Sequence, residues 1–279
     1  MTQPALSLSE VHLAASLPMY DLPEVREATD EVWIAVAAAM LRRGIAAPTT
    51  LTRQDGSLKA LWTAPELLLS QTCGYPRVTS LRGWVSVVAT PSYSATGCTG
   101  AHHRAAVIVG RDVKAHTLAD LRGLRCAIND ASSNTGMNLL RAAVSAVARG
   151  LPFFEAVMVT GSHAASVAAV ADGQADVASV DPVTWTLLQR HRPQLAAAVR
   201  VFGWTSSSPG LPLVTSRRSD AALVGGIREA LAEAVRAPGL GAARQELLLT
   251  GFETLPPESY DRILELEATA SARGYPVLR

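Results

Sequence analysis

The segment from 121 to 185 contains three short apolar runs, and each ends in polar residues that open a helical pattern. The runs are CAI at 126–128, AVMV at 156–159 and DVASV at 176–180. Three strand-to-helix junctions in succession are typical of a parallel sheet with crossover helices. Ligands of such sheets bind beyond the carboxyl ends of the strands. The sequence therefore predicts an α/β protein with a ligand site at these junctions.

The first junction, Asp130–Gly136, has the composition of an anion site. Backbone N–H groups at a helix N-terminus bind negative oxygens without Lys or Arg, and hydroxyl groups add donors. The alternative is a simple cap on the helix that runs to about Arg149. A cap needs one such residue, whereas this loop supplies a row of small polar residues and a glycine, which favours the anion site. The predicted contacts are Ser132, Ser133, Asn134, Thr135 and Gly136.

The second and third junctions supply one candidate side chain each. His163 falls in the first turn of a helix, where a neutral imidazole N–H can donate to an anion. The alternative is a surface histidine at a helix start. Asp181 fits the N-cap of a helix over 182–189, because Pro182 suits the first helical position. Asp181 also fits a ligand contact, as acceptor for an amine or another protonated group, and both roles are compatible.

The chain resembles the phosphate/phosphite/phosphonate substrate-binding proteins of ABC transporters. The matching segments are LRGLRCAINDASSNTG at 121–136, GSHAASVAAVADGQADVASVDPVTW at 161–185 and GLPLVTS at 210–216. This family has the type 2 periplasmic binding-protein fold, so the resemblance implies two doubly wound α/β domains joined by a two-segment hinge.

The resemblance also implies roles for particular residues. In the family, a helix start of small polar residues binds the phosphonate oxygens through amides and hydroxyls, which assigns that role to Ser133, Asn134 and Thr135. The ligand-contacting histidine is then His163, and Asp181 falls where members often have an acidic contact. The family loop often reads Ser-Thr-Ser-Gly, and the middle residue differs here.

Two polar breaks indicate where the chain crosses between domains. Pro91–Gly100 precedes a strand at 105–109, and Trp204–Gly210 precedes the run LPLVTS. We expect one domain from 1–95 plus 205–279, and a second, contiguous domain from 96–204. Two crossings place a cleft at the interface, where small ligands preferentially bind.

The first domain is expected to supply the opposite wall of the cleft from its own strand ends. The candidates are Tyr20, Gln71, Thr72, Cys73 and Tyr75. The alternative for the two tyrosines is a half-buried surface position. In the resembling family, aromatic residues of this domain close over the ligand, and Tyr20 and Tyr75 lie in corresponding regions.

The remaining pattern predicts the other elements. Strands are expected at 11–17, 49–52, 66–71 and 83–90, and helices at 22–43, 220–236, 241–249 and 257–273. The last three helices are expected to cover the first domain's sheet.

Composition narrows the possible partners. The chain has 279 residues, 18% of them charged, and a net charge of +1, which argues against nucleic acid or an anionic membrane as partner. No segment reaches the ~18 apolar residues of a membrane span. Its three cysteines, Cys73, Cys98 and Cys126, lack metal-type spacing, and neither a metal nor a cofactor is expected.

The predicted function is capture of a small phosphonate-, phosphate- or carboxylate-bearing anion without bond chemistry, with an ABC permease as candidate partner. One alternative is a cytoplasmic ligand sensor of the same fold, and a less favoured one is an enzyme using Cys73, His163 and Asp181. The start of the chain lacks the features of a signal peptide. A periplasmic location is thus expected if a signal peptide has been removed and a cytoplasmic one otherwise, and Met1 favours the second.

Overall fold

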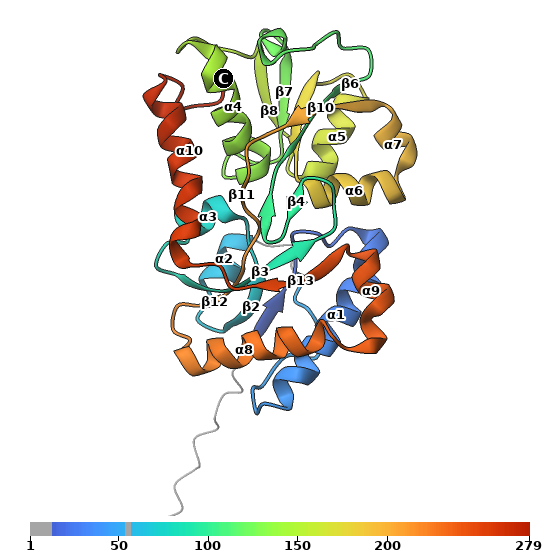
Figure 1. Ribbon diagram of the computed structural model, residues 1–279, viewed down its shortest axis with the longest axis vertical. Helices are drawn as coiled ribbons and strands as arrows, with labels where there is room; N and C mark the ends of the chain where they lie inside the picture. Colours follow the sequence, from blue (N-terminus) through green and yellow to red (C-terminus); the bar gives the residue numbers. More distant parts are fainter. Residues whose placement is uncertain (1–12, 54–56) are drawn as a thin grey trace, which may run out of the picture.

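Alternating strand and helix patterns build two five-stranded sheets, which lie one above the other in Figure 1. The computed structural model describes residues 13–53 and 57–279. Within these ranges, none of the helices combines the length and the apolar character needed to cross a membrane. The fold class is therefore α/β, as predicted.

The first sheet has the strand order β1-β2-β12-β3-β13. Its strands are β1 (Ala14–Ser16), β2 (Leu67–Gln71), β12 (Leu213–Ser216), β3 (Val85–Tyr93) and β13 (Leu249–Glu253). β1 and β2 are parallel, whereas β12 runs antiparallel to β2 and β3, and β13 antiparallel to β3. Successive strand residues point to opposite faces, so Leu213 joins the core on one face and Val214 the core on the other.

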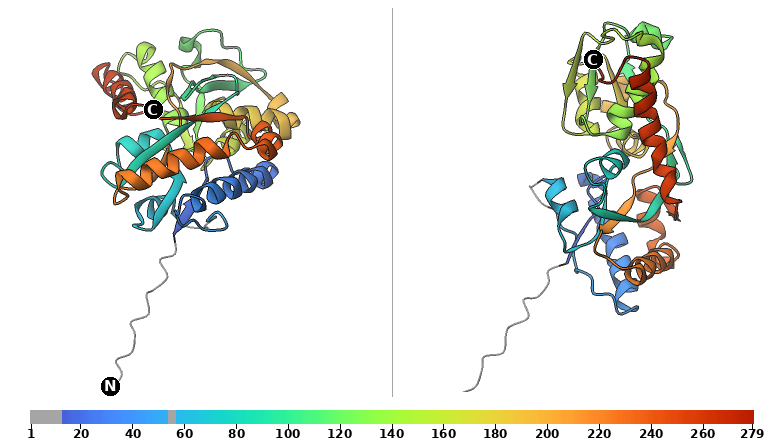
Figure 2. Two further views of the ribbon diagram at one scale, coloured as in Figure 1. Left: turned by 60° about the horizontal axis from the view of Figure 1, so that its bottom comes forward. Right: turned by 90° about the vertical axis from the view of Figure 1, so that its left-hand side faces the viewer.

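Helices cover both faces of this sheet. One face packs against α1 (Arg26–Leu41), α8 (Ala221–Ala234) and α9 (Gly241–Glu246), and α1 and α8 lie side by side in Figure 2. The other face carries α2 (Leu58–Thr63), with α3 (Gly74–Val78) following β2.

The second sheet has the order β10-β6-β9-β7-β8. Its strands are β10 (Val199–Trp204), β6 (Ala106–Gly110), β9 (Val177–Val180), β7 (Arg125–Ile128) and β8 (Ala156–Val159). β7 pairs in parallel with β8 and β9, as the three junctions predict, and β6 is antiparallel to β9 and β10. α4 (Leu139–Ala148) packs on one face, and α5 (His163–Ala171), α6 (Pro182–His191) and α7 (Pro193–Ala197) lie on the other.

Short helical turns complete the chain. They are η1 (Pro23–Val25), η2 (Leu118–Leu121), the π-helix η3 (Asn134–Asn138), η4 (Pro238–Leu240) and η5 (Pro257–Tyr260).

The two crossings between the sheets pair with each other. β4 (Cys98–Thr99), β5 (His102–His103) and β11 (Ser208–Pro209) form a small antiparallel sheet in the order β11-β5-β4. β5 and β4 belong to the first crossing and β11 to the second. β3 continues to Tyr93, so the first crossing starts later than the predicted break at Pro91.

Two expectations are wrong in detail. Residues 49–52 form no strand. The Thr52 amide donates to the Ala15 carbonyl at 2.6 Å, but Pro48 precedes the segment and this backbone bond is not continued by a ladder of further bonds. The predicted helix 241–249 stops at Glu246, and Leu249–Glu253 is strand β13 instead. Periodicity alone did not separate a short helix from a short strand there. Residues 11 and 12 of the first predicted strand lie outside the described ranges.

The last helix also departs from expectation. α10 (Asp261–Ala272) begins beside α3 but packs mainly along α4, and the right-hand view of Figure 2 shows it beside both halves. Leu266 joins Leu139 and Ala142 of α4 in one cluster. Tyr275 and Leu278 then enter the core of the second sheet. The chain end thus does not simply cover the first sheet, because its apolar residues match the exposed side of α4.

Candidate functional site

The polar ends of the three junctions meet in a cleft between the two halves. The cleft has a volume of about 530 Å³. The second half lines it with Asn129, Asp130, Ser132, Ser133, Thr135, Gly161, Ser162, His163, Ala164, Asp181 and Thr184. The first half lines it with residues 18–22, part of α2, Cys73 and Pro76. The convergence follows from parallel pairing, which brings the carboxyl ends of β7, β8 and β9 to one edge.

The first junction supplies both a helix cap and further polar groups. The Ser133 hydroxyl accepts a hydrogen bond from the Gly136 amide at 3.0 Å, so Ser133 is the N-cap. The Thr135 hydroxyl points toward His163, with 3.2 Å between Oγ1 and Nε2. Both Ser133 and Thr135 line the cleft while being almost fully buried.

His163 opens α5 beside this hydroxyl. Ser162 is the N-cap of that helix and accepts from the Ala165 amide at 3.1 Å. The Nδ1 atom of His163 has no hydrogen-bond partner in the described part of the chain. Burial lowers the pKa of His163, and the nearby Asp181 carboxylate only partly opposes this, so the ring is uncharged at neutral pH.

Asp181 performs the capping role predicted for it and is also paired. Its Oδ1 accepts from the amides of Val183 at 2.9 Å and Thr184 at 3.2 Å. Its Oδ2 lies 3.5 Å from Nδ1 of His103, and both side chains are at most 1% exposed. Burial by itself raises the pKa of Asp181. The neighbouring His103 and His163 rings and the Thr184 amide outweigh it and hold that pKa below its usual range.

His103 is a residue that the sequence reasoning missed. It lies in β5, within the first crossing, where the polar composition indicated only a connection. The signal was available, because two adjacent histidines directly before an apolar strand are unusual in a linker. Asp181, the partner of His103, lies 78 positions further along the sequence, so no local pattern could indicate this pairing.

The first half contributes Tyr20, Thr72 and Cys73 at or behind the opposite wall. The Cys73 thiol accepts from the Asn134 amide at 3.3 Å, and burial raises its pKa. Tyr20 packs edge-on against Tyr93, with ring centroids 5.2 Å apart, and burial followed by the charge of Asp181 raises the pKa of its hydroxyl well above normal. Thr72 is fully buried behind this wall.

Four predicted contacts lie away from the cleft. The Tyr75 hydroxyl donates to Glu267 of α10 at 2.6 Å, because the turn of α3 directs this side chain outward. The Gln71 amide donates to the Tyr93 hydroxyl and faces a separate apolar cavity. Asn134 donates to the Ser208 hydroxyl at 2.8 Å, and Gly136 is packed against Asn129. These four residues, like Thr72, are not among those that line the cleft.

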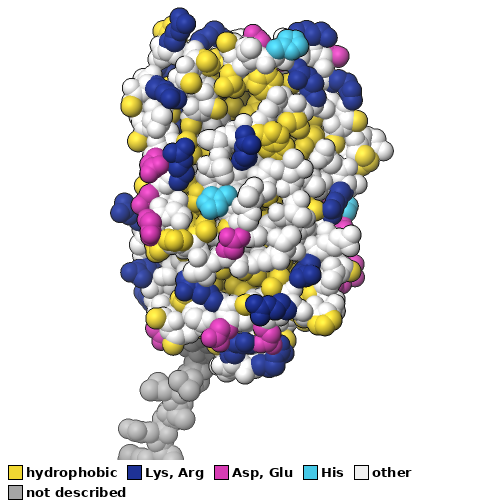
Figure 3. All heavy atoms as spheres, in the orientation of Figure 1, with side chains coloured by type: hydrophobic (Ala, Val, Ile, Leu, Met, Phe, Trp, Pro, Cys, Tyr) yellow, Lys and Arg dark blue, Asp and Glu magenta, His cyan; other side chains and the backbone are white. Residues whose placement is uncertain are grey.

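Two carboxylates at the cleft, those of Asp130 and Asp21, already accept from nearby donors. Oδ1 of Asp130 accepts from the Ser132 amide at 2.6 Å and from the Ser132 hydroxyl. Asp21 accepts from Arg53 at 2.6 Å. On the face drawn in Figure 3, cationic and anionic side chains intermingle, in keeping with the net charge of +1. An anion in the cleft would therefore interact with hydrogen-bond donors at the helix starts rather than with a strong overall electrostatic field.

The residues of the enzyme alternative each have other partners. Cys73 contacts the Asn134 amide, His163 contacts Thr135, and Asp181 contacts His103 and its own helix. Among the described residues, hydrogen bonds do not link the three into the nucleophile–base–orienter chain of nucleophilic catalysis.

Two α/β halves with paired crossings and a polar cleft define a class, the type 2 periplasmic binding proteins, and solved structures that are similar to this chain have that fold. The chain matches the family model described as "ABC transporter, phosphonate, periplasmic substrate-binding protein" over residues 66–260. It belongs to this family. Members of this family are the substrate-binding components of ABC transporters, and they are normally periplasmic.

Three solved structures illustrate the similarity. XAC2383 from Xanthomonas citri, bound to chloride, is 20% identical with a TM-score of 0.71, and 94% of this chain and 98% of that one are covered. A binding protein component of an ABC phosphonate transporter (PA3383) from Pseudomonas aeruginosa is 15% identical with a TM-score of 0.74, covering 94% and 87%. PhnD1 from Prochlorococcus marinus, in complex with methylphosphonate, is 12% identical with a TM-score of 0.74, covering 94% and 99%. At these identities the likeness shows the fold alone. A comparison with curated proteins gives no match.

Proposed function

We propose that this protein captures a small anion bearing a phosphonate, phosphate or carboxylate group in the cleft between its two halves. The observation that carries the proposal is the Thr135–His163 pair, since two helix starts bring a hydroxyl and an imidazole to 3.2 Å in one cleft. In the first turn of each helix, amides lack intrahelical acceptors, and those of Gly136 and Ala165 bond to the cap hydroxyls of Ser133 and Ser162.

The protonation states support an anion as ligand. With the pKa of His163 lowered by burial, a neutral ring donates one N–H and adds no charge that would need a permanent partner. The carboxylates of Asp130 and Asp181 are engaged by amides and by His103, which limits their repulsion of an anion. Asp181 in turn can accept from an amine or a protonated oxygen of the ligand.

The ligand is proposed to lie between two domains, residues 1–95 with 205–279 and residues 96–204. In this division α10 and the residues after it reach across to the second domain, because they pack on α4 and in the core of the second sheet. The wall opposite the anion loop then comes from the loop that holds Tyr20 and from Cys73.

The proposed partner is an ABC permease. Family membership supports this, as does the description of the Pseudomonas aeruginosa relative as a component of a phosphonate transporter. The methylphosphonate complex of the Prochlorococcus marinus protein makes that compound the natural first probe.

Calorimetric titration with methylphosphonate, inorganic phosphate and acetate tests the proposal. We expect at least one of these anions to bind the wild-type protein. Thr135→Val should weaken that binding roughly 5- to 100-fold, because it removes a hydrogen bond to a charged group worth about 1–3 kcal/mol.

Thr269→Val is the matched control, because Thr269 lies on α10 and its hydroxyl bonds only to the Glu265 carbonyl. Its affinity should equal that of the wild type. If none of the three anions binds, the proposed function is wrong. If they bind and Thr135→Val has no effect, the function stands and the site assignment fails.

A further inference from the structure

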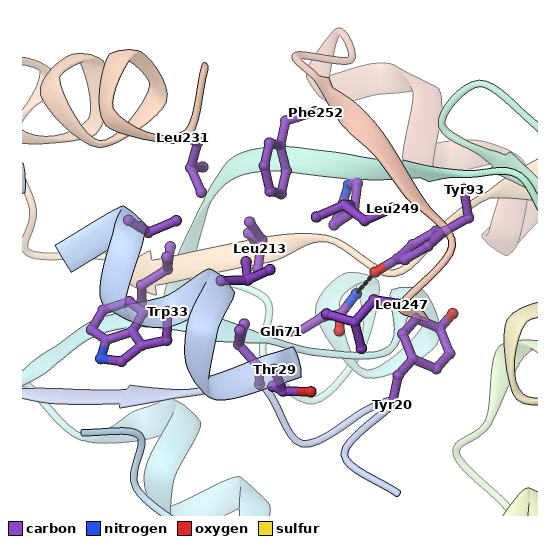
Figure 4. A pocket seen from close by; sticks show the side chains of 15 residues that line it. Tyr20, Thr29, Trp33, Gln71, Tyr93, Leu213, Leu231, Leu247, Leu249 and Phe252 are labelled. Atoms are coloured by element: carbon purple, nitrogen blue, oxygen red, sulfur yellow. Dashed lines mark hydrogen bonds between the residues drawn. The ribbon is translucent and has the colours of Figure 1, made fainter. Parts of the chain in front are cut away.

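A second cavity lies inside the first half of the molecule, between α1 and the first sheet (Figure 4). Its volume is about 60 Å³. The lining is almost entirely apolar and includes Trp33, Leu213, Leu231, Leu249 and Phe252. Protein interiors normally leave few voids larger than a water molecule, and apolar voids stay dry and accept apolar molecules. A space of this kind is therefore available to a hydrocarbon group.

One end of this cavity adjoins the ligand cleft. Tyr20 lines both spaces, so its side chain is part of the wall between them. The few polar groups of the cavity gather at this end, where the Gln71 amide donates to the Tyr93 hydroxyl at 3.3 Å. The cavity is thus apolar at its far end and polar toward the cleft, which is the arrangement that an amphiphilic ligand requires.

Tyr20 is suited to move aside. It lies in the irregular segment between β1 and η1, and its buried hydroxyl has no hydrogen-bond partner among the described residues. Turning the ring breaks an edge-on contact with Tyr93 and loosens the apolar cluster that Tyr20 shares with residues such as Val183 and Leu187, but it breaks no hydrogen bond. An unpartnered buried hydroxyl also gains from any movement that lets it meet a polar group.

We infer that the cavity receives the hydrocarbon substituent of the anion bound in the cleft, with Tyr20 as the gate between the two spaces. This inference rests on the proposed function and specifies the ligand as an alkylphosphonate or a comparable short-chain alkyl anion. An apolar cavity of about 150 Å³ binds benzene, so one of about 60 Å³ accommodates a substituent of about two or three carbons.

A chain-length series tests the inference. The Kd values of methyl-, ethyl-, propyl- and pentylphosphonate are measured by calorimetry. Each carbon that enters the cavity should tighten binding about fourfold, the equivalent of ~0.8 kcal/mol per buried methylene. The Kd should therefore fall from methyl to propyl and rise again at pentyl, which exceeds the available space. Binding that is constant or weakens from methyl onward overturns the inference while leaving the proposed function intact.

A filled cavity provides the control against apolar contacts elsewhere in the cleft. Leu213→Phe adds volume at the centre of the cavity, and Leu231→Phe does the same from α8 if the first variant folds poorly. The ratio of the methyl to the propyl Kd should fall toward one in either variant. Leu151→Phe, at a side chain that is 62% exposed, should keep the wild-type ratio.

A wild-type ratio in the folded Leu213→Phe and Leu231→Phe variants would place the substituent elsewhere and overturn the inference. Failure of all four phosphonates to bind would remove both this inference and the proposed phosphonate ligand.

Discussion

Replacing Asp181 with Ala should be one of the most destabilising single changes on the cleft side of the second sheet. The change removes two buried cap bonds, at 2.9 and 3.2 Å, and deprives the buried His103 ring of its carboxylate neighbour. Loss of the cap costs about 0.5–2 kcal/mol, and an unsatisfied buried polar group about 1–3 kcal/mol. The expected loss is then about 2–4 kcal/mol, or roughly 5–12 °C in the unfolding temperature measured by calorimetry.

Asp220→Ala is the matched control, since Asp220 caps α8 through a single bond to the Leu223 amide at 2.8 Å on the exposed surface. Its loss should be about 1 kcal/mol. Asp181→Asn keeps a cap acceptor but removes the charge, so its loss of stability should lie between those of the Asp181→Ala and Asp220→Ala variants. Equal losses for Asp181→Ala and Asp220→Ala would refute the contribution assigned to His103.

Three further outcomes are expected. Gly136→Ala should lower the unfolding temperature by several degrees, because a Cβ there would lie 1.8 Å from a neighbouring amide oxygen, whereas Gly225→Ala in open space on α8 should not. Tyr75→Phe should destabilise the fold by about 1 kcal/mol through the lost bond to Glu267, with anion affinity by calorimetry unchanged. Because burial lowers the pKa of His163, acidification from pH 7 to 5 forces a proton onto a buried ring, so the unfolding temperature should fall more in wild type than in His163→Gln.

Local sequence pattern was sufficient for the three parallel strands of the second sheet and for their junctions. The apolar runs at 126–128, 156–159 and 176–180 are strands β7, β8 and β9, and the polar residues after them face one cleft. Junction chemistry is a short-range property, since the strand, the cap and the first helical turn are contiguous. Thr135 and His163 could be found for that reason.

Long-range pairing set the limit of the sequence reasoning. β13 forms because Phe252 and its neighbours pair with the edge of β3, which lies about 160 positions earlier in the sequence. No local periodicity distinguishes the segment LLLTGFE from the end of a helix. The sequence predicts Tyr75 at the cleft because this residue closely follows strand β2. The direction of its side chain depends on Glu267 in a helix that the pattern placed elsewhere.

The position of α10 has a mechanical consequence. Two connections between rigid bodies leave one free rotation, about the line that joins them, and the paired strands β5 and β11 lie on that line. α10 forms a third link, which Figure 1 places to the side of these strands. In the proposed two-domain division, a rotation that opens the cleft would disturb the contacts of α10 with α3 or with α4, among them that of Asn138 with the Ile263 carbonyl. Substitutions between α10 and α4 would then change how long a ligand stays bound, although these residues do not touch the ligand.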